Sequence, residues 1–196
     1  CIYQYSVELN LYDALNTNTN GDTGMTSKLK TDILETVSGS GTIALTNQLS
    51  GMTSASMPSG SVLQVISVTN TEAAQGGYLV QTSSSTFVAA ALAVSITPSS
   101  TSSKIMVFFN TSVYRTSNSA YLTVYRDSTN IAGANGLAAP TGGLTVWLPV
   151  GVQYLDSPNT TSSVQYTLYA RSQSGVLYVG GDGDLINSIT VMEIKG

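Results

Sequence analysis

Residues 104–114 read KIMVFFNTSVY, and this stretch decides the fold class of the chain. Every second position holds an apolar or β-branched side chain: Ile105, Val107, Phe109, Thr111 and Val113. Successive side chains of a strand point to opposite faces, so the alternation predicts a β-strand with one face in a core. Residues 164–171, VQYTLYAR, alternate in the same way and predict a second strand of this kind.

Similar stretches, rich in Val, Ile, Tyr and Thr, recur through the rest of the chain after residue 60. We expect further strands at residues 62–69, 77–82, 87–96, 120–126, 144–155, 176–179 and 188–194. Clusters of Pro, Gly, Asp, Asn and Ser separate them, and no stretch of useful length there has helical periodicity. About nine strands joined by short loops, without crossover helices, predict an all-β fold: an antiparallel β-sandwich of the jelly-roll type.

The beginning of the chain has a different character and predicts an extended N-terminal arm. Residues 1–11 alternate like a strand, but linkers rich in Asn, Ser and Gly follow. We therefore divide the chain into an arm, attachment or stalk segment at residues 1–59 and a sandwich head at residues 60–196. An arm without its own core is ordered most easily on a partner, so residues 1–11 are expected to add a strand to another subunit or protein. Cys1 is an unusual first residue, and we expect the true start to lie upstream.

The composition excludes several kinds of chemistry. The 196 residues include no histidine and one cysteine, which removes His-based triads, imidazole metal sites and internal disulfides. Charged residues make up 9% and the net charge is −4, so cations are too few to neutralise a nucleic acid backbone. No apolar run approaches the roughly 20 residues of a membrane helix. We expect no cofactor, no nucleic acid partner, no membrane insertion and no catalytic residues, and hence a protein that is not an enzyme.

Two motifs suggest a metal site. Asp182 and Asp184 lie in the loop GGDGD, and oxygen-rich loops of this kind can hold calcium. The alternative, which we favour, is a tight loop with two solvated acids. Residues 16–22, NTNTNGD, imitate a calcium loop without its first Asp, and Ser27 stands where the bidentate Glu belongs. The 11 acids are scattered, so a two-carboxylate glycosidase site would need distant residues to meet in the fold.

Tyrosine is the most abundant aromatic residue, with 11 copies against 3 Phe and 1 Trp. Its ring is flat, stiff and amphipathic, which suits both sugar stacking and subunit interfaces. The candidate interface or receptor-binding residues are Tyr121, Tyr125, Tyr169, Tyr178 and Trp147. For most tyrosines the alternative is packing on the sheet, with the hydroxyl reaching solvent or a neighbouring subunit. Trp147 lies within LTVWLPV, and its apolar neighbours predict burial in a core or a subunit interface.

Six motifs follow one another in order after residue 60. They are GSVLQV (60–65), STFV (85–88), LAVSITPSSTSSKIMV (92–107), RDSTNI (126–131), LDSPNTT (155–161) and SITVMEI (188–194). As an ordered set they resemble a module of marine bacteriophage (cyanophage-like) tail or head fibre and virion structural proteins. KLKTDI (28–33), followed by GSGTIALTN (39–47), is similar to the N-terminal part of such proteins, whereas residues 1–24 depart from the family.

The resemblance implies a location on the surface of the virion, a jelly-roll head of the C1q and tumour-necrosis-factor type, and a homotrimer. It also implies contacts with other virion proteins through the N-terminal arm, and it supplies no catalytic residues. The expected function is that of a non-enzymatic, fibre-type virion structural protein that attaches to a host-surface glycan. One alternative is an architectural role, as a capsid or tail decoration protein or a repeating fibre subunit. Another is a polysaccharide-degrading enzyme.

Overall fold

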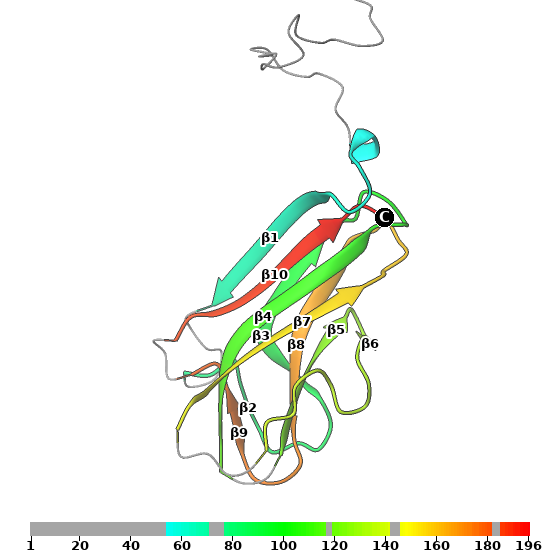
Figure 1. The fold of residues 1–196 in the computed structure, drawn as a ribbon. Coiled ribbons are helices and arrows are strands. Elements are labelled where there is room, and N and C mark those ends of the chain that lie inside the picture. Colours follow the sequence, from blue (N-terminus) through cyan, green and yellow to red (C-terminus); the bar gives the residue numbers. More distant parts are fainter. Residues whose placement is uncertain (1–53, 71–76, 117–118, 142–145, 182–184) are drawn as a thin grey trace, which may run out of the picture. The chain divides into compact units, whose positions relative to one another are not determined.

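The computed structural model describes residues 54–70, 77–116, 119–141, 146–181 and 185–196 (Figure 1). All of these belong to the compact unit Ser50–Gly196. Most of the arm expected at residues 1–59 lies outside the described residues, and so do the strand expected at residues 1–11 and the loop at 16–22. Within the described ranges, no helix is long and apolar enough to cross a bilayer.

Ten strands and one short 3-10 helix, η1 (Ser54–Ser56), make up the regular structure of the described residues. The strands are β1 (Val62–Asn70), β2 (Val80–Thr82), β3 (Val88–Ile96), β4 (Lys104–Arg115), β5 (Ala120–Arg126), β6 (Thr129–Asn130), β7 (Leu148–Asp156), β8 (Val164–Ser172), β9 (Leu177–Val179) and β10 (Asn187–Ile194). Every stretch after residue 60 that was predicted to be a strand contains one. The alternation of side chains therefore located the strands correctly.

The strands form two antiparallel sheets that pack on each other (Figure 1). The six-stranded sheet has the order β1-β10-β4-β9-β2, with β7 on the other edge of β4, and the four-stranded sheet has the order β3-β8-β5-β6. If the short strands β2 and β9 are set aside, the first and last strands pair. Consecutive strands then lie in opposite sheets, except in the β5–β6 hairpin. This connectivity is that of a jelly roll, which confirms the predicted fold class.

The core lies between the sheets and is built from the inward side chains of the alternating strands. Its members from the two stretches that predicted the fold are Ile105, Val107, Phe109 and Val113 on β4, and Val164, Tyr166, Leu168 and Ala170 on β8. Burying each large apolar side chain stabilises the fold by about 1.5–3 kcal/mol. The side chains at the intervening positions reach the outer faces of the sheets, where a ligand or a second subunit could contact them.

The strand β6 lies inside a cluster of turn-forming residues, and the sequence pattern does not predict it. Arg126 pairs with Thr129, so Asp127 and Ser128 form a two-residue hairpin turn. Asp127 has a φ of 52°, in the left-handed region that short polar side chains tolerate. Its carboxylate accepts a 2.9 Å hydrogen bond from the backbone N–H of Gln165, which holds the hairpin on β8. A strand of two residues is too short for alternation to be visible.

Candidate functional site

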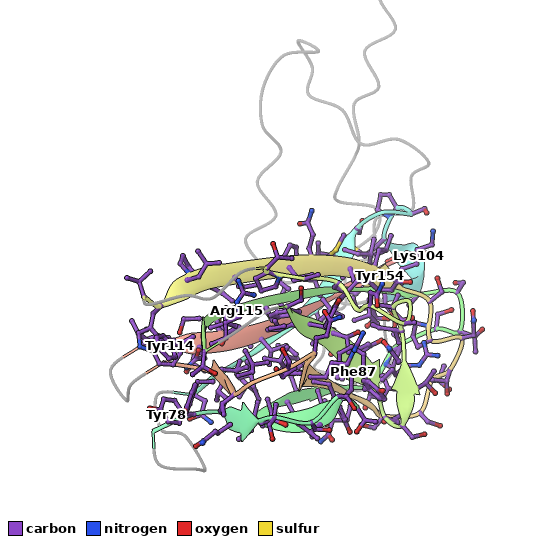
Figure 2. The ribbon with its side chains drawn as sticks, turned by 90° about the horizontal axis from the view of Figure 1, so that it is seen from below. Tyr78, Phe87, Lys104, Tyr114, Arg115 and Tyr154 are labelled. Carbon is purple, nitrogen blue, oxygen red and sulfur yellow. The ribbon has the colours of Figure 1, made fainter. Side chains whose placement is uncertain are left out.

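Four aromatic side chains gather on the outer face of the six-stranded sheet, and we term Tyr78, Tyr114, Trp147 and Tyr178 the tryptophan cluster. Tyr114 and Tyr178 are direct partners in the pairing of β4 with β9. The chain neighbours of both tyrosines are buried on the inner face, so the two rings lie on the outer face. Tyr78 precedes β2, and Trp147 precedes β7. Figure 2 shows Tyr78 and Tyr114 at one end of the sandwich, away from Lys104.

The rings of the tryptophan cluster support one another. The ring centroids of Tyr78 and Tyr178 are 4.9 Å apart, and those of Tyr78 and Trp147 are 5.9 Å apart. Tyr114 lies 5.6 Å from Trp147 and 5.8 Å from Tyr178. Aromatic pairs at such distances contribute about 0.5–1.5 kcal/mol each beyond area burial. All four side chains are half-buried, so the cluster is pre-organised and still presents ring surface outward.

Two of the predicted interface residues, Trp147 and Tyr178, belong to this cluster. The expectation that Trp147 lies in the core is wrong: the residue stands just before β7, outside the core, and its indole is half-buried on the surface. Burial of Trp147 in a subunit interface stays a prediction. Tyr78 and Tyr114 were missed, although KIMVFFNTSVY holds a signal for Tyr114. The ring stands at an outward position of the same alternation that defines the core.

A second group lies on the outer face of the four-stranded sheet, and we term Phe87, Tyr121, Tyr125, Tyr169 and Arg171 the arginine cluster. Tyr121 of β5 pairs directly with Arg171 of β8. The guanidinium carbon of Arg171 lies 4.0 Å from the ring centroid of Tyr121 and 5.2 Å from that of Phe87. Tyr125 and Tyr169 stack with centroids 3.9 Å apart and an angle of 21° between the rings. Phe87 meets Tyr125 edge-on at 6.3 Å.

The other three predicted residues, Tyr121, Tyr125 and Tyr169, all belong to the arginine cluster. The five predicted residues therefore do not form one site but divide between the outer faces of opposite sheets. Phe87 and Arg171 were missed. Arg171 closes the stretch VQYTLYAR at an outward position. Its ring partners come from β5 and from the residue before β3, so they become visible only once the strand register is known.

The buried carboxylate of Asp156 connects the two sheets. Its Oδ2 accepts hydrogen bonds from Arg126 Nη1 at 2.6 Å and from the hydroxyl of Tyr166 at 2.7 Å. Burial raises the pKa of Tyr166 far above its usual value, and the hydrogen bond to Asp156 and the charge of Asp156 raise it further. Burial alone would lower the pKa of Arg126, but the hydrogen bond to Asp156 and the opposite charge raise it. Asp156, Arg126 and Tyr166 thus have a structural role, because their hydrogen bonds join β7 to the four-stranded sheet.

Glu193 of β10 is a second buried carboxylate with all its partners inside the fold. Its Oε1 accepts hydrogen bonds from the hydroxyl of Ser103 at 2.6 Å and from the backbone N–H and hydroxyl of Ser99 at 2.7 Å. Its Oε2 accepts one from Gln64 at 2.6 Å. Burial opposes the charged form, but the hydrogen bonds from Ser103, Ser99 and Gln64 outweigh it and hold the pKa of Glu193 below its usual value.

The other residues predicted to bind a metal or to act as a carboxylate pair do not come together as a site among the described residues. Asp182 and Asp184 lie outside the described residues, so the calcium interpretation stays a prediction. In the part of the chain that the structure describes, no three His, Cys, Asp or Glu side chains are grouped as a metal site. Each described acid accepts hydrogen bonds within the fold: Asp156 from Tyr166 and Arg126, Glu193 from Ser103, Ser99 and Gln64, and Asp127 from the backbone N–H of Gln165.

The outer face of the six-stranded sheet also carries a row of apolar side chains that crosses four strands. Val65 of β1 pairs with Met192 of β10, Met192 pairs with Met106 of β4, and Met106 pairs with Leu155 of β7. We term these four residues the apolar rung. Val65 is 53% exposed and Leu155 45% exposed, whereas the two methionines are half-buried. An apolar row of this length at two sheet edges is typical of a surface that meets another protein.

A shallow hollow of about 440 Å³ lies beside the apolar rung. Its lining is uncharged and consists of Phe108, Phe109, Asn110, Gly151, Val152, Gln153, Ser188 and Thr190. The hollow exists partly because Gly151 has no side chain, and a Cβ there would come no closer than 3.8 Å to other atoms. The surface near Gly151 is thus concave, although the backbone could accept a larger residue.

No protein-family model matches the chain, and no curated protein matches it by sequence. Among solved structures, the chain is similar to one from "Structure of infectious bursal disease virus Gx strain", with a TM-score of 0.36 and 12% identity. The match covers 67% of this chain and 36% of that viral chain, so it extends over little more than a third of the latter.

Proposed function

We propose that this chain is a non-enzymatic structural protein of a virus particle, of the fibre type, whose sandwich head attaches to a glycan on the host surface. The observation on which the proposal rests is the pair of aromatic clusters on the outer faces of a jelly roll. Sugars stack their apolar faces on flat aromatic rings, and rings already fixed by neighbours lose little freedom on binding. The ordered set of fibre-like motifs supports the assignment to a virion.

The described carboxylates support binding rather than hydrolysis. A glycosidase needs two carboxylates that flank the scissile bond and are free to act on it. Asp156 and Glu193 are buried and occupied by donors of the fold, and the exposed Asp127 holds the backbone of Gln165. In this proposal the glycan is held and not cleaved.

We propose that three copies assemble through the outer face of the six-stranded sheet, with the apolar rung at the contact. Covering Val65 and Leu155 removes apolar surface from water and protects the edge strands β1 and β7 from unspecific pairing. Met106 and Tyr114 are separated by about 26 Å along β4 at the usual rise per residue. This separation leaves the tryptophan cluster accessible. The low charge of the chain limits repulsion between copies.

The same apolar rung also favours a second candidate, a purely architectural role as a decoration protein or a repeating fibre subunit. In both roles, residues 1–59 join the head to other virion proteins. Copy number distinguishes the two. Hundreds of copies in a lattice or filament indicate the architectural role, and a few copies at a fibre tip indicate attachment.

Sedimentation of the full chain, combined with binding to host cells, tests the proposal. We expect a particle of three chains of 20.4 kDa that binds cells and releases no new reducing ends from their surface polysaccharides. A monomer would contradict the trimer, and failure to bind cells would leave the architectural role in its place. Release of reducing ends would show that the protein is an enzyme.

A further inference from the structure

We infer that the arginine cluster binds a sugar that carries a carboxylate, such as a uronic acid unit. The inference rests on the proposed glycan attachment and names the class of glycan and the residues that recognise it. Arg171 would pair with the carboxylate, and the stacked rings of Tyr125 and Tyr169 would hold the sugar ring. Phe87 and Tyr121 would fix the guanidinium between them.

Arg171 is a cation without an acidic partner in the described part of the chain. The ion pair found there joins Arg126 to Asp156. Arg171 Nη2 donates to Asn135 Oδ1 at 3.1 Å and, more weakly, to the carbonyl of Ala134 at 3.4 Å. The donors at Nη1 and Nε have no partner among the described residues. A guanidinium binds a carboxylate in a bidentate pair through Nη2 together with either Nη1 or Nε. Nη1 and Nε are available here, and the 3.4 Å bond from Nη2 to Ala134 is weak enough to be exchanged for the ligand.

The surroundings of Arg171 hold its charged group in place before any ligand arrives. Tyr121 lies directly opposite in the strand register, and its ring faces the guanidinium carbon at 4.0 Å. Phe87 supplies a second ring at 5.2 Å, and Asn135 fixes the orientation of the planar group. Contacts of this kind displace part of the water around the cation. A carboxylate that binds here therefore meets a fixed and partly desolvated partner.

The stacked tyrosines lie at a distance that suits the sugar ring of the same ligand. Tyr169 and Arg171 are two positions apart on β8 and face the same side, which separates them by about 7 Å. This is comparable to the span from one edge of a pyranose ring to a carboxylate on its opposite edge. Tyr125 stacks on one face of Tyr169 at 3.9 Å and fixes its ring in place. The carboxylate and the ring of one sugar unit can therefore meet Arg171 and Tyr169 together.

The overall charge of the protein gives little general attraction for polyanions. The chain has 7 cationic residues and a net charge of −4, so tight binding of a polyanion would have to come from a local site. The exposed Lys104 belongs to β4 in the other sheet and lies apart from Phe87 in Figure 2. Lys104 is thus a matched control, because its removal changes the net charge as much as the removal of Arg171 does.

The test compares three soluble galactose-based polymers by calorimetry on the full chain: polygalacturonate, neutral galactan and sulfated galactan. We expect polygalacturonate to bind most tightly. Arg171→Gln should weaken that binding at least about tenfold, since hydrogen bonds to a charged group contribute roughly that much. Arg171→Lys should restore only part of the loss, because an ammonium group cannot form the bidentate pair. Lys104→Gln should leave binding unchanged.

Thermal unfolding shows whether each variant is folded. If Arg171→Gln does not fold, the affinity of Arg171→Lys for polygalacturonate is compared with that of Lys104→Gln instead. Equal affinity for the carboxylated and sulfated polymers would overturn the inference, because it would reflect charge alone. So would wild-type affinity in Arg171→Gln, or in Arg171→Lys when that variant is the comparison. If the full chain binds host cells but not polygalacturonate, this inference fails and the proposed attachment stands. If it binds neither cells nor any of the three polymers, both fail.

Discussion

Ser103 donates a 2.6 Å hydrogen bond to the buried carboxylate of Glu193. Ser103 ends the turn TPSSTSS before β4, and Glu193 lies in the last strand, so the bond joins two of the motifs that resemble phage fibre proteins. Ser99 adds two donors from the same turn. The serines of this motif thus hold the turn on a buried charge.

Glu193→Gln should lower the free energy of unfolding by about 2–4 kcal/mol, because hydrogen bonds to charged groups contribute about 1.5–3 kcal/mol and an amide cannot accept at both ends. Urea denaturation at pH 7 measures the change. The exposed Lys104→Gln is the control, with an expected effect below about 0.5 kcal/mol. A Glu193→Gln protein as stable as the wild type would mean that the carboxylate does not hold the turn.

The stability of the head should also fall in acid through Glu193. Its pKa in the folded chain is held below the ordinary value of 4.5, so its contribution is present above that pH. The contribution is lost as the pH falls through the lower folded value. Urea midpoints between pH 7 and pH 3 should therefore decrease more steeply for the wild type than for Glu193→Gln. Parallel curves for the two proteins would refute this.

At alkaline pH, the sensitive group should be Tyr166. Its pKa in the folded chain is raised above the ordinary value of 10.0, so its contribution to stability is present below that pH and decreases as the pH rises above it. Tyr166→Phe removes the 2.7 Å hydrogen bond to Asp156 and should cost about 1–3 kcal/mol at pH 7. It should also flatten the alkaline decrease above pH 10, as measured by urea denaturation. Tyr154→Phe is the control, and an equally steep decrease in both variants would contradict the assignment.

Two adjacent hydroxyls on β4 should respond in opposite directions to removal. The buried Thr111 donates a 2.9 Å hydrogen bond to Asn187 Oδ1, whereas the buried hydroxyl of Ser112 has no partner among the described residues. Thr111→Val should destabilise the fold by about 1–2 kcal/mol, and Ser112→Ala should be neutral or stabilising by up to about 1 kcal/mol. Thermal unfolding measures both. A clear loss of stability in Ser112→Ala would show that the hydroxyl has a partner.

Sequence alternation predicts the strands and the inner or outer side of each residue because both are local, period-two properties of the chain. Ile105 and Tyr166 were placed in strands on this basis, and the structure buries both. The sites depend on register between distant strands, and no local pattern contains that information. Tyr121 meets Arg171, and Tyr114 meets Tyr178, only because β5 pairs with β8 and β4 with β9. For the same reason, the hydrogen-bond partners of Glu193 could not be predicted from the sequence.

Deletion of residues 1–24 should leave a folded head but abolish attachment to other virion proteins or polymerisation. The alternating residues 1–11 are proposed to add a strand to a partner, and the compact unit Ser50–Gly196 contains the sheets. Circular dichroism reports the fold, and incorporation into particles reports attachment. Deletion of residues 1–11 alone should have the same effect. Normal incorporation of both deletions would disprove the proposed strand addition.

Met106→Lys should convert the proposed trimer into monomers without unfolding the head. Met106 is the rung residue of β4, between Met192 and Leu155, and faces outward in a half-buried position. In a monomer, the new ammonium group can reach water along its flexible stem. In the trimer it would be buried without a partner, which costs several kcal/mol for each copy. Sedimentation should therefore show trimer dissociation increased by more than about 100-fold.

Ser95→Lys is the matched control for this experiment, because it adds the same charge at an exposed position of β3 on the opposite sheet. It should remain trimeric, since the proposed contact does not involve the four-stranded sheet. If Met106→Lys stays trimeric while Ser95→Lys dissociates, the subunits must instead meet through the four-stranded sheet. That face carries the arginine cluster, so the same result would place Arg171 and its aromatic neighbours in a subunit interface.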